Sequence, residues 1–473
     1  MGSQAKETFS VKRVAIIGAG PAGLAAAKYL FAQDAFETID IFEKQSEVGG
    51  VWFYSPQPSS TLGVPQVSPH TPPDPPLNLG GSLVFPSPMY EILHTNIPRR
   101  LMAFSDFPFP QDSLIFPSRD AVQDYLFAYS GSLRHLIKFS TRVEDVCLWQ
   151  SDGKDQWDFT FTSLETNISS TTTYDAVVVA SGHYSLTYLP EIKGIREFHA
   201  RHPGVITHAK LYRTPAPFKN RKVVVVGNAA SGLDISAQIS GVCRKPLLLS
   251  VRTATPQSNL DFVGGEEVGV IEEFLVDERG VRFHDGRVEK DLDAVVFATG
   301  YLFSYPFLSL KPQLVKDGRR VHELYQELFY IDHPTLVFPG LPIKVVPFSV
   351  CETQAAIISR TWANRLPLPS TEEMHKWEEA EAGKRGASFH VWPKGGDAEF
   401  VNSIHEKLQG GVGKPPPRWD DELMWQRQIY SDAKLKFEVQ GRTAKSLAEL
   451  GFVYSSKGSG ATQKARADED IAT

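Results

Sequence analysis

Three glycines and one glutamate have the spacing of a turn that binds a dinucleotide. Gly18, Gly20 and Gly23 follow the apolar run 14–17 and lead into an alanine-rich stretch that favours a helix. In such a turn the first glycine makes the tight bend, the second lets the backbone approach a pyrophosphate, and the third lets helix pack on strand. The start of the helix offers free N–H groups to the phosphates. Glu43 ends the next apolar run, 20 residues after Gly23, where an acid can bond a ribose hydroxyl.

A second unit has the same form but a different residue to contact the ribose. The apolar run 222–226 leads into Gly227, and Gly232 stands at the position of the third glycine, whereas Ala229 replaces the middle one. Arg252 ends the next run, at 246–251, and in both units 25 residues separate the first glycine from the residue that would contact the ribose. An arginine can bind a 2′-phosphate as a planar fork, whereas an acid repels it. The first unit therefore predicts FAD or NAD and the second NADP, with a solvated strand-end arginine as the alternative.

Two further apolar runs predict the strands that complete these units. The runs 174–180 and 293–298 end in Ser181-Gly182 and Thr299-Gly300. Each glycine turn would lie at the carboxyl end of its strand, where ligands bind in open α/β sheets. We therefore predict an α/β fold with two Rossmann-type dinucleotide-binding domains.

The composition argues against several classes of protein. Among 473 residues, 49 Lys and Arg stand against 55 Asp and Glu, a net charge of −6, so no bulk positive field attracts nucleic acid or an anionic membrane. The three cysteines lie far apart, which favours neither a redox dithiol nor a zinc site, and no metal site is expected. No signal peptide or long apolar run is evident. We expect a cytoplasmic protein with a small-molecule substrate; whether it forms a homo-oligomer stays open.

Two segments outside these units can be assigned from their composition. The stretch 63–88 is dense in proline and glycine and cannot form helix or sheet interior, so it predicts a long loop. Such a loop either covers the substrate entrance or is a passive insertion. Near the end of the chain, 419–434 predicts a helix.

The sequence also resembles the flavin-containing monooxygenases, which are class B flavoprotein monooxygenases, and among them the soluble fungal and yeast type. The segment 202–212 is similar to the FxGxxxHxxx(Y/F) signature; His202 departs from it, whereas Gly204, His208 and Tyr212 keep the spacing. The other similar segments, in family order, are 18–23 with Glu43 (the FAD fingerprint), 49–52 (GGVW), 95–96 (TN), 105–110 (SDFPFP), 297–301 (FATGY), 335–340 and 352–355.

This resemblance implies a glutathione-reductase-like arrangement, in which an NADPH-binding domain is inserted into an FAD-binding domain. We expect the FAD-binding domain at 10–205 and 325–455 and the NADPH-binding domain at 206–324. A disordered tail is expected at 456–473, where the sequence is polar and rich in small residues.

The resemblance further implies an enzyme that uses NADPH, FAD and O2. In the family NADPH reduces the flavin, oxygen then gives a C4a-hydroperoxyflavin, and one oxygen atom passes to a soft nitrogen or sulfur of a small molecule. Such chemistry needs a dry, preorganised pocket rather than an acid–base pair. Baeyer–Villiger oxygenation of a ketone is one alternative, although that family's signature ends in Trp followed by Pro or Asp and this one in Tyr212-Arg213. An uncoupled NADPH oxidase or redox-sensing flavoprotein is another.

Asn96 is the expected catalytic side chain, because an amide can donate and accept hydrogen bonds without carrying charge; the alternative is a turn residue. Gln354 is expected near the flavin ring, or else as a polar residue at a helix start. Trp52 packs on the flavin or on the core. His208 and Tyr212 are assigned to the domain junction and the NADPH site, or to the core.

The complete candidate site has two parts. Residues expected to bind FAD are Gly18, Gly20, Pro21, Ala22, Gly23, Glu43, Lys44, Gly50, Val51, Trp52, Asn96 and Gln354. Residues expected to bind NADPH are Gly227, Asn228, Ala230, Ser231, Gly232, Arg252, His208, Tyr212, Thr299 and Gly300.

Overall fold

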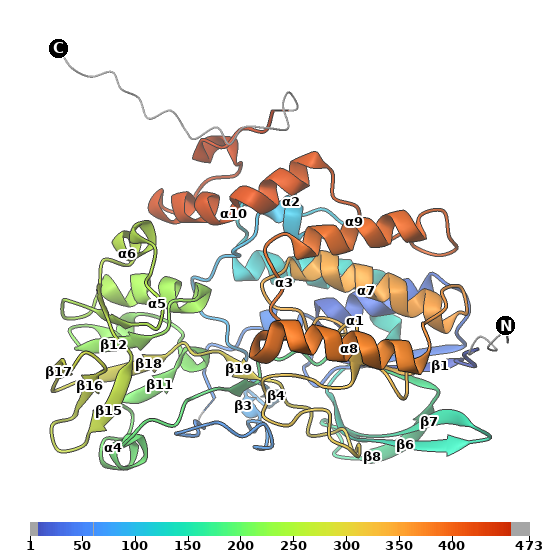
Figure 1. Ribbon diagram of the computed structural model, residues 1–473, viewed down its shortest axis with the longest axis horizontal. Helices are drawn as coiled ribbons and strands as arrows, with labels where there is room; N and C mark the ends of the chain where they lie inside the picture. Colours follow the sequence, from blue (N-terminus) through green and yellow to red (C-terminus); the bar gives the residue numbers. More distant parts are fainter. Residues whose placement is uncertain (1–7, 60, 456–473) are drawn as a thin grey trace.

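The computed structural model describes residues 8–59 and 61–455, and within them two units, each built on a largely parallel sheet, lie side by side (Figure 1). The larger unit lies on the right of the view and the smaller, coloured green to yellow, on the left. The α/β fold with two Rossmann-type units is thereby confirmed. The tail expected at 456–473 lies outside the described residues.

The larger unit has a seven-stranded sheet whose centre is apolar and buried. Its strands, in spatial order, are β20 (Leu324–Tyr325), β21 (Phe329–Tyr330), β22 (Leu336–Val337), β9 (Ala176–Val179), β1 (Arg13–Ile17), β2 (Thr38–Phe42) and β5 (Ile137–Lys138). The pairs from β22 to β5 are parallel. Helix α1 (Pro21–Phe31) connects β1 to β2. In a parallel sheet both faces are covered, so the strands are apolar along their length rather than alternating with polar residues.

The smaller unit has a five-stranded sheet that is parallel throughout. Its strands, in spatial order, are β11 (Ile206–His208), β18 (Ala294–Phe297), β12 (Val223–Val226), β13 (Leu248–Ser250) and β14 (Glu266–Val268). Helix α5 (Ala230–Ser240) follows β12 as α1 follows β1. The two predicted units therefore share one local architecture.

Smaller antiparallel sheets complete both units. They are β6 (Thr141–Ser151), β7 (Lys154–Ser163) and β8 (Ser169–Tyr174); β15 (Ile271–Leu275), β16 (Gly280–Phe283) and β17 (Val288–Glu289); β10 (Leu186–Thr187) with β19 (Tyr301–Leu302); and β3 (Leu77–Leu79) with β4 (Ser82–Val84). The β10–β19 pair joins segments that follow β9 of the larger unit and β18 of the smaller one.

The remaining helices gather largely on the larger unit. They are α2 (Arg99–Met102), α3 (Arg119–Tyr129), α4 (Ile195–Arg201), α6 (Gln257–Val263), α7 (Pro347–Trp362), α8 (Thr371–Arg385), α9 (Gly396–Leu408) and α10 (Asp421–Val439). Helix α7 is buried along almost its whole length and packs on α1 in the main core. Among the described residues, no helix combines the length and apolarity that crossing a membrane requires.

Several predicted boundaries need correction. The strand expected at 174–180 is β9 alone, because Tyr174 ends β8 and pairs with Trp157. The strand expected at 246–251 is shorter, and the helix expected at 419–434 is α10, whose N-cap Asp420 accepts a hydrogen bond from the N–H of Leu423. The proline-rich loop contains the β3–β4 hairpin, which sequence reasoning missed.

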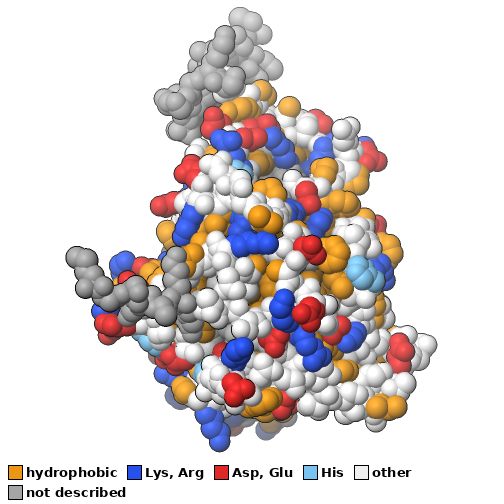
Figure 2. All heavy atoms as spheres, turned by 90° about the vertical axis from the view of Figure 1, so that its right-hand side faces the viewer, with side chains coloured by type: hydrophobic (Ala, Val, Ile, Leu, Met, Phe, Trp, Pro, Cys, Tyr) orange, Lys and Arg blue, Asp and Glu red, His pale blue; other side chains and the backbone are white. Residues whose placement is uncertain are grey.

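The chain crosses between the two sheets twice. It enters the smaller unit's sheet at β11 and returns to the larger unit's sheet at β20. These crossings support an inserted domain, although the boundaries at 205/206 and 324/325 stay a prediction. On the face shown in Figure 2, basic and acidic side chains are interspersed, which fits the small net charge.

Candidate functional site

The glycine turn of the larger unit is too crowded for side chains. A Cβ on Gly18, whose φ is +101°, would lie 2.7 Å from the carbonyl oxygen of Ala180, and one on Gly23 would lie 1.9 Å from that of Gly18. A Cβ on Gly20 would lie 3.3 Å from Cα of Gly50, and one on Gly50 only 2.8 Å from Cα of Gly20. The turn therefore packs directly on the GGVW segment, and two predicted parts of the FAD site lie next to each other.

The turn of the smaller unit repeats the first and third glycine contacts but not the second. Gly227 has a φ of +107°, and a Cβ on it would lie 2.8 Å from the carbonyl oxygen of Ala298. A Cβ on Gly232 would lie 2.0 Å from the carbonyl oxygen of Gly227. Ala229 is exposed at the N-cap of α5, so the protein leaves room for its methyl group, and its effect on the approach of a phosphate stays a prediction.

Both helices that follow these turns begin in a way that suits an anion. The N-cap residues Gly20 and Ala229 provide no side-chain cap, and neither α1 nor α5 has an acidic residue in its first turn. The first N–H groups of a helix lack partners within the helix, and the helix dipole favours negative charge there. The two sites therefore fit the pyrophosphates of two dinucleotides.

Glu43 lies at the carboxyl end of β2, directly beside the first turn. Its buried carboxylate accepts hydrogen bonds from the N–H groups of Ala19, at 2.7 Å, and Gln45, at 2.8 Å. Burial raises the pKa of this carboxyl above its ordinary value. Each oxygen has a second lone pair, so the carboxylate can still accept a ribose hydroxyl. The neighbouring Lys44 places its ammonium 4.8 Å from the ring centre of Phe85, and burial lowers the pKa of this group.

Gln354 on α7 has an unused hydrogen-bond donor. Its Oε1 accepts the N–H of Gly340 at 2.8 Å, whereas its Nε2 is buried without a partner among the described residues. A Cβ on Gly340 would lie 3.5 Å from Cβ of Ala22, which places this region against the first helical turn of α1. A free buried donor beside the dinucleotide turn fits a bound polar group. Trp52 is half-buried and packs against the main core, and its contact with the flavin stays a prediction.

Asn96 is exposed on a rigidly held segment. The N–H of Thr95 donates to the carbonyl of Pro117 at 2.9 Å, and that of Arg99 donates to Ile115 at 2.8 Å. The buried Thr95 hydroxyl donates to the carbonyl of Ile97. The Asn96 amide itself has no hydrogen-bond partner among residues 8–59 and 61–455, so it is available to a ligand. No described interaction joins it directly to the glycine turns.

Arg252 stands exposed after β13, and the loop that carries it is tied to the second turn. Asn228 donates from Nδ2 to the carbonyl of Thr253 at 2.9 Å and to the hydroxyl of Thr255 at 3.0 Å. Within the described part of the chain, Arg252 forms no ion pair. Its guanidinium is therefore free for an anionic partner beside the second turn.

His208 and Tyr212 are buried, and their polar atoms already have protein partners. His208 accepts the N–H of Lys210 at Nδ1, so Nε2 carries the proton and donates to the carbonyl of Gly300 at 3.1 Å. Burial lowers the pKa of His208 to about 3, so it is neutral at physiological pH. The Tyr212 hydroxyl donates to Oε1 of Gln238 on α5 at 2.8 Å. These contacts support an architectural role for both residues, and direct contact with NADPH stays a prediction.

Sequence reasoning missed the structural role of Arg213, the residue that follows this signature. The Arg213 guanidinium is buried and donates to the carbonyls of two neighbouring residues and of three from the larger unit. These carbonyls belong to Lys210, Tyr212, Ser55, Gln57 and Ser87. Arg213 therefore fastens the signature segment to the chain that follows GGVW. The only sequence signal was its position beside Tyr212.

The proline-rich stretch is anchored by a nearly buried ion pair. The Lys210 ammonium lies 2.7 Å from a carboxylate oxygen of Asp74 and also donates to the carbonyl of Ser185. The Lys210 side chain is 5% exposed and that of Asp74 is 25% exposed. Lys210 and Asp74 also line a cavity of about 250 Å³, together with Gln66 and Pro73. The stretch thus covers the junction between the two units.

We expect Asp74→Ala to loosen this stretch. The variant leaves the Lys210 ammonium buried with one carbonyl partner, which is costly, so proteolytic cleavage within 61–76 should become about ten times faster. The double variant Asp74→Ala/Lys210→Met removes the unpaired charge and should be cleaved more slowly than the single variant. Equal cleavage of the parent and Asp74→Ala would show that the ion pair does not hold the loop.

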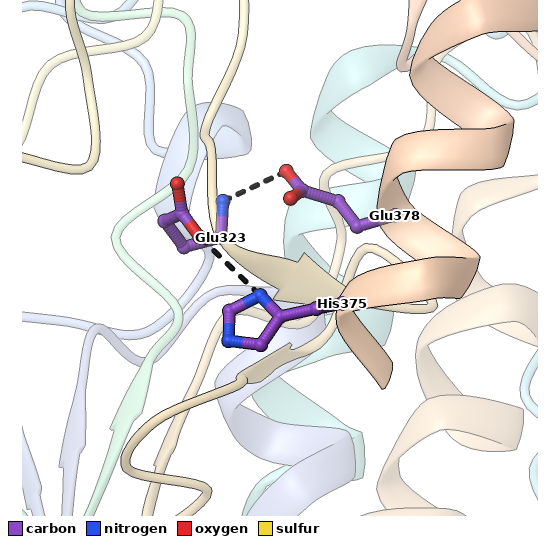
Figure 3. Close-up of side chains that lie close together, drawn as sticks. All are labelled: Glu323, His375 and Glu378. Atoms are coloured by element: carbon purple, nitrogen blue, oxygen red, sulfur yellow. Dashed lines mark hydrogen bonds and ion pairs between the residues drawn. The ribbon is translucent and has the colours of Figure 1, made fainter. Parts of the chain in front are cut away.

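One cluster has the composition of a metal site, namely Glu323, His375 and Glu378 (Figure 3). Glu378 accepts the backbone N–H of Glu323 at 2.8 Å and also pairs with Arg320. His375 lies 3.6 Å from the Glu323 carboxylate and 3.1 Å from that of Asp332. Because these groups already have protein partners and a guanidinium supplies the positive charge, we assign the cluster to the packing of α8 against β20.

Comparisons with known proteins match most of the chain. A family model described as flavin-binding monooxygenase-like matches residues 86–257 and 268–414, and one for an NAD(P)-binding Rossmann-like domain matches 16–89. The chain is 33% identical to the thiol-specific monooxygenase of Saccharomyces cerevisiae, over 94% of this chain and 97% of that one. It is 34% identical to flavin-containing monooxygenase FMO GS-OX-like 4 of Arabidopsis thaliana, over 76% and 78%. Among solved structures, S-allyl-L-cysteine S-oxygenase of Allium sativum has a TM-score of 0.74 at 26% identity, over 94% and 98%.

Proposed function

The chain belongs to the flavin-binding monooxygenase-like family, and on that premise we propose that it transfers one oxygen atom from O2 to a sulfur atom of a small molecule. FAD and NADPH are its cofactors. Sulfur is preferred over nitrogen as the acceptor because the names of two similar proteins refer to a thiol or to S-oxygenation. A soft nitrogen atom is the second candidate acceptor.

The observation that carries this proposal is the pair of uncapped helix starts that follow the parallel strands β1 and β12 in one chain. Glu43 beside one of them suits a free ribose diol, and Arg252 near the other suits a 2′-phosphate. The pair therefore supports FAD in the larger unit and NADPH in the smaller one.

The cofactors supply the redox chemistry, in which the flavin takes electrons from NADPH and passes them to oxygen. The chain's residues bind and orient. Gly20 and Gly50 bring backbone groups to the phosphates, and Gln354 offers its free donor beside the α1 turn. Asn96 offers an uncharged amide to the reacting groups. A soft sulfur atom is already nucleophilic, so no side chain has to remove a proton from it.

The test offers the flavin-loaded protein three substrates with NADPH and oxygen: a thiol or thioether, a secondary amine and a cyclic ketone. We expect sulfur oxygenation to be fastest, with product approaching one molecule per NADPH consumed. Faster turnover of the ketone would favour Baeyer–Villiger chemistry. NADPH consumption that yields only hydrogen peroxide with every substrate would favour the uncoupled oxidase.

Arg252→Ala is expected to weaken the preference for NADPH over NADH. A charge-assisted contact to a phosphate contributes roughly 1.5–3 kcal/mol, so the KM for NADPH should rise about tenfold to a hundredfold. The KM for NADH should stay nearly unchanged, since NADH lacks the 2′-phosphate. Steady-state kinetics with both nucleotides measure this, and an equal rise for both would show that Arg252 does not contact the phosphate.

A further inference from the structure

The C-terminal helix α10 touches both units of the molecule. It packs against α2, which follows the Asn96 segment, and against α6 of the smaller unit. Figure 1 shows α10 above α5 and α6 at the top of the view. The match to the family model ends at residue 414, whereas α10 begins at Asp421. The helix therefore lies outside the part of the chain that this match covers.

Arg442, just beyond α10, joins three parts of the chain. Its Nη1 donates to the carbonyl of Ile92 at 3.0 Å, and its Nη2 donates to Oδ1 of Asp234 at 3.2 Å. Its Nε donates to Glu438 on α10 at 2.5 Å, and Lys434 braces the same carboxylate at 2.5 Å. The planar guanidinium can make all three contacts at once, which a single ammonium group could not do with the same geometry.

Asp234 is the residue of the smaller unit that Arg442 contacts, and both of its carboxylate oxygens have partners. It lies on α5, in the second helical turn after the predicted NADPH phosphate site. Its Oδ2 accepts a hydrogen bond from the Tyr90 hydroxyl, while Oδ1 faces Arg442. Its side chain is 16% exposed and that of Arg442 is 20% exposed, so both charges are largely shielded from water. Pairs shielded in this way are screened less by salt than surface pairs.

The backbone places Arg442 at this junction by an uncommon conformation. Gly441 and Arg442 both have positive φ values, of +83° and +61°, and the N–H of Arg442 donates to the carbonyl of Phe437 at 2.9 Å. The left-handed region is disfavoured for a residue with a Cβ, and surrounding contacts are needed to maintain it. The helix end turns back by this route and presents the guanidinium to α5 and to the segment 90–94.

The segment held by Arg442 is the one that carries Asn96. Arg442 binds the carbonyl of Ile92, and the N–H of Arg119 donates to the carbonyl of Leu93. Farther along the C-terminal chain, the carbonyl of Ala444 accepts the N–H of Ile115, whose own carbonyl accepts the N–H of Arg99. The C-terminal region thus holds the Asn96 segment on both sides.

We propose that Arg442 is a positioning residue whose guanidinium fixes the Asn96 segment in place relative to the NADPH-binding unit. This inference rests on the proposed function, because Asn96 matters only if oxygen transfer occurs beside it. Arg442 touches no reacting group and acts through the carbonyl of Ile92 and through Asp234. Loss of Arg442 should change the position of the Asn96 segment relative to the bound nucleotide. Binding of the sulfur substrate should stay nearly unchanged.

The experiment compares Arg442→Gln, Arg442→Lys and Lys445→Gln in the flavin-loaded protein. Hydrogen exchange of peptides covering 90–97 should become about ten times faster in Arg442→Gln. Product formed per hydrogen peroxide released should fall about fivefold, with the KM for the sulfur substrate within about twofold of the parent. Arg442→Lys keeps the charge but not the planar fork and should be intermediate. Lys445→Gln removes one charge from an exposed position nearby and should behave as the parent.

Parental exchange and parental product ratio in Arg442→Gln would overturn the proposal, as would equal losses in Lys445→Gln. If Arg442→Gln does not fold, Asp234→Asn keeps the side-chain volume, removes the charge that faces Arg442, and should give the same two changes. If the parent protein makes no oxygenated product, the proposed function fails, whereas the exchange measurement still decides whether Arg442 holds the segment.

Discussion

A Gly20→Val variant is expected to purify with less than about a tenth of the parental flavin. Gly20 and Gly50 already approach so closely that a Cβ on Gly20 would lie 3.3 Å from Cα of Gly50. A branched side chain would push the GGVW segment away and would occupy the space in which the pyrophosphate meets the start of α1. The ratio of flavin to protein absorbance in the purified variant measures this loss.

The second unit supplies a matched control. Ala229 occupies the same position before α5 as Gly20 does before α1, but it already carries a Cβ and is exposed. Ala229→Val should therefore keep the parental flavin content and affect only the KM for NADPH. Full flavin content in Gly20→Val would show that the first unit does not bind FAD through this turn.

The comparison of these two turns shows which features the sequence could predict. Spacing predicts the first and third glycines, and the structure supports the steric part of that prediction, because a Cβ at either position would meet the backbone of its own strand-turn-helix unit or of the chain that follows the adjacent strand. Spacing assigns the middle glycine to the approach of the pyrophosphate, but it does not reveal the protein segment that also lies against it. That segment contains Gly50, 30 residues away, and no local pattern states which segment will pack on a turn.

Element boundaries illustrate the same limit. The apolar pattern predicted the strands well, yet Tyr174 was assigned to the wrong one, since an apolar run does not reveal where the chain changes sheets. The β3–β4 hairpin was missed because proline density indicates a loop, whereas Gly80 and Gly81 with positive φ make a tight turn inside it.

In the candidate site, even less of the supporting structure could be predicted from the sequence. Its motif residues were identifiable from the sequence, but the residues that hold them in place were not. Arg213 and Arg442 donate hydrogen bonds to backbone carbonyls. Every residue has a backbone carbonyl, so the sequence does not indicate which carbonyl an arginine will bind. Asp234 was equally invisible, since its partners Tyr90 and Arg442 come from segments more than a hundred residues distant.

We expect Asn96 to matter after the flavin has been reduced and not before. The Asn96 amide is exposed and lies on a segment fixed at Thr95 and Arg99. Replacing it should leave the glycine turns unchanged, because no described interaction joins it to them. In Asn96→Leu and Asn96→Asp, reduction of the flavin by NADPH should therefore stay within about an order of magnitude of the parental rate, as transient kinetics without oxygen can measure.

Oxygen transfer in the same variants should be strongly impaired. Asn96→Leu removes the hydrogen bonds at nearly constant size, and Asn96→Asp adds a negative charge where electron-rich oxygen must be accommodated. Loss of such contacts costs roughly 2–4 kcal/mol, so the ratio of product to hydrogen peroxide should fall by a factor of about thirty or more. This ratio is measured at saturating substrate and NADPH. If Asn96→Leu transfers oxygen as efficiently as the parent, Asn96 is a turn residue, and backbone groups together with the bound nucleotide must perform the role assigned to it here.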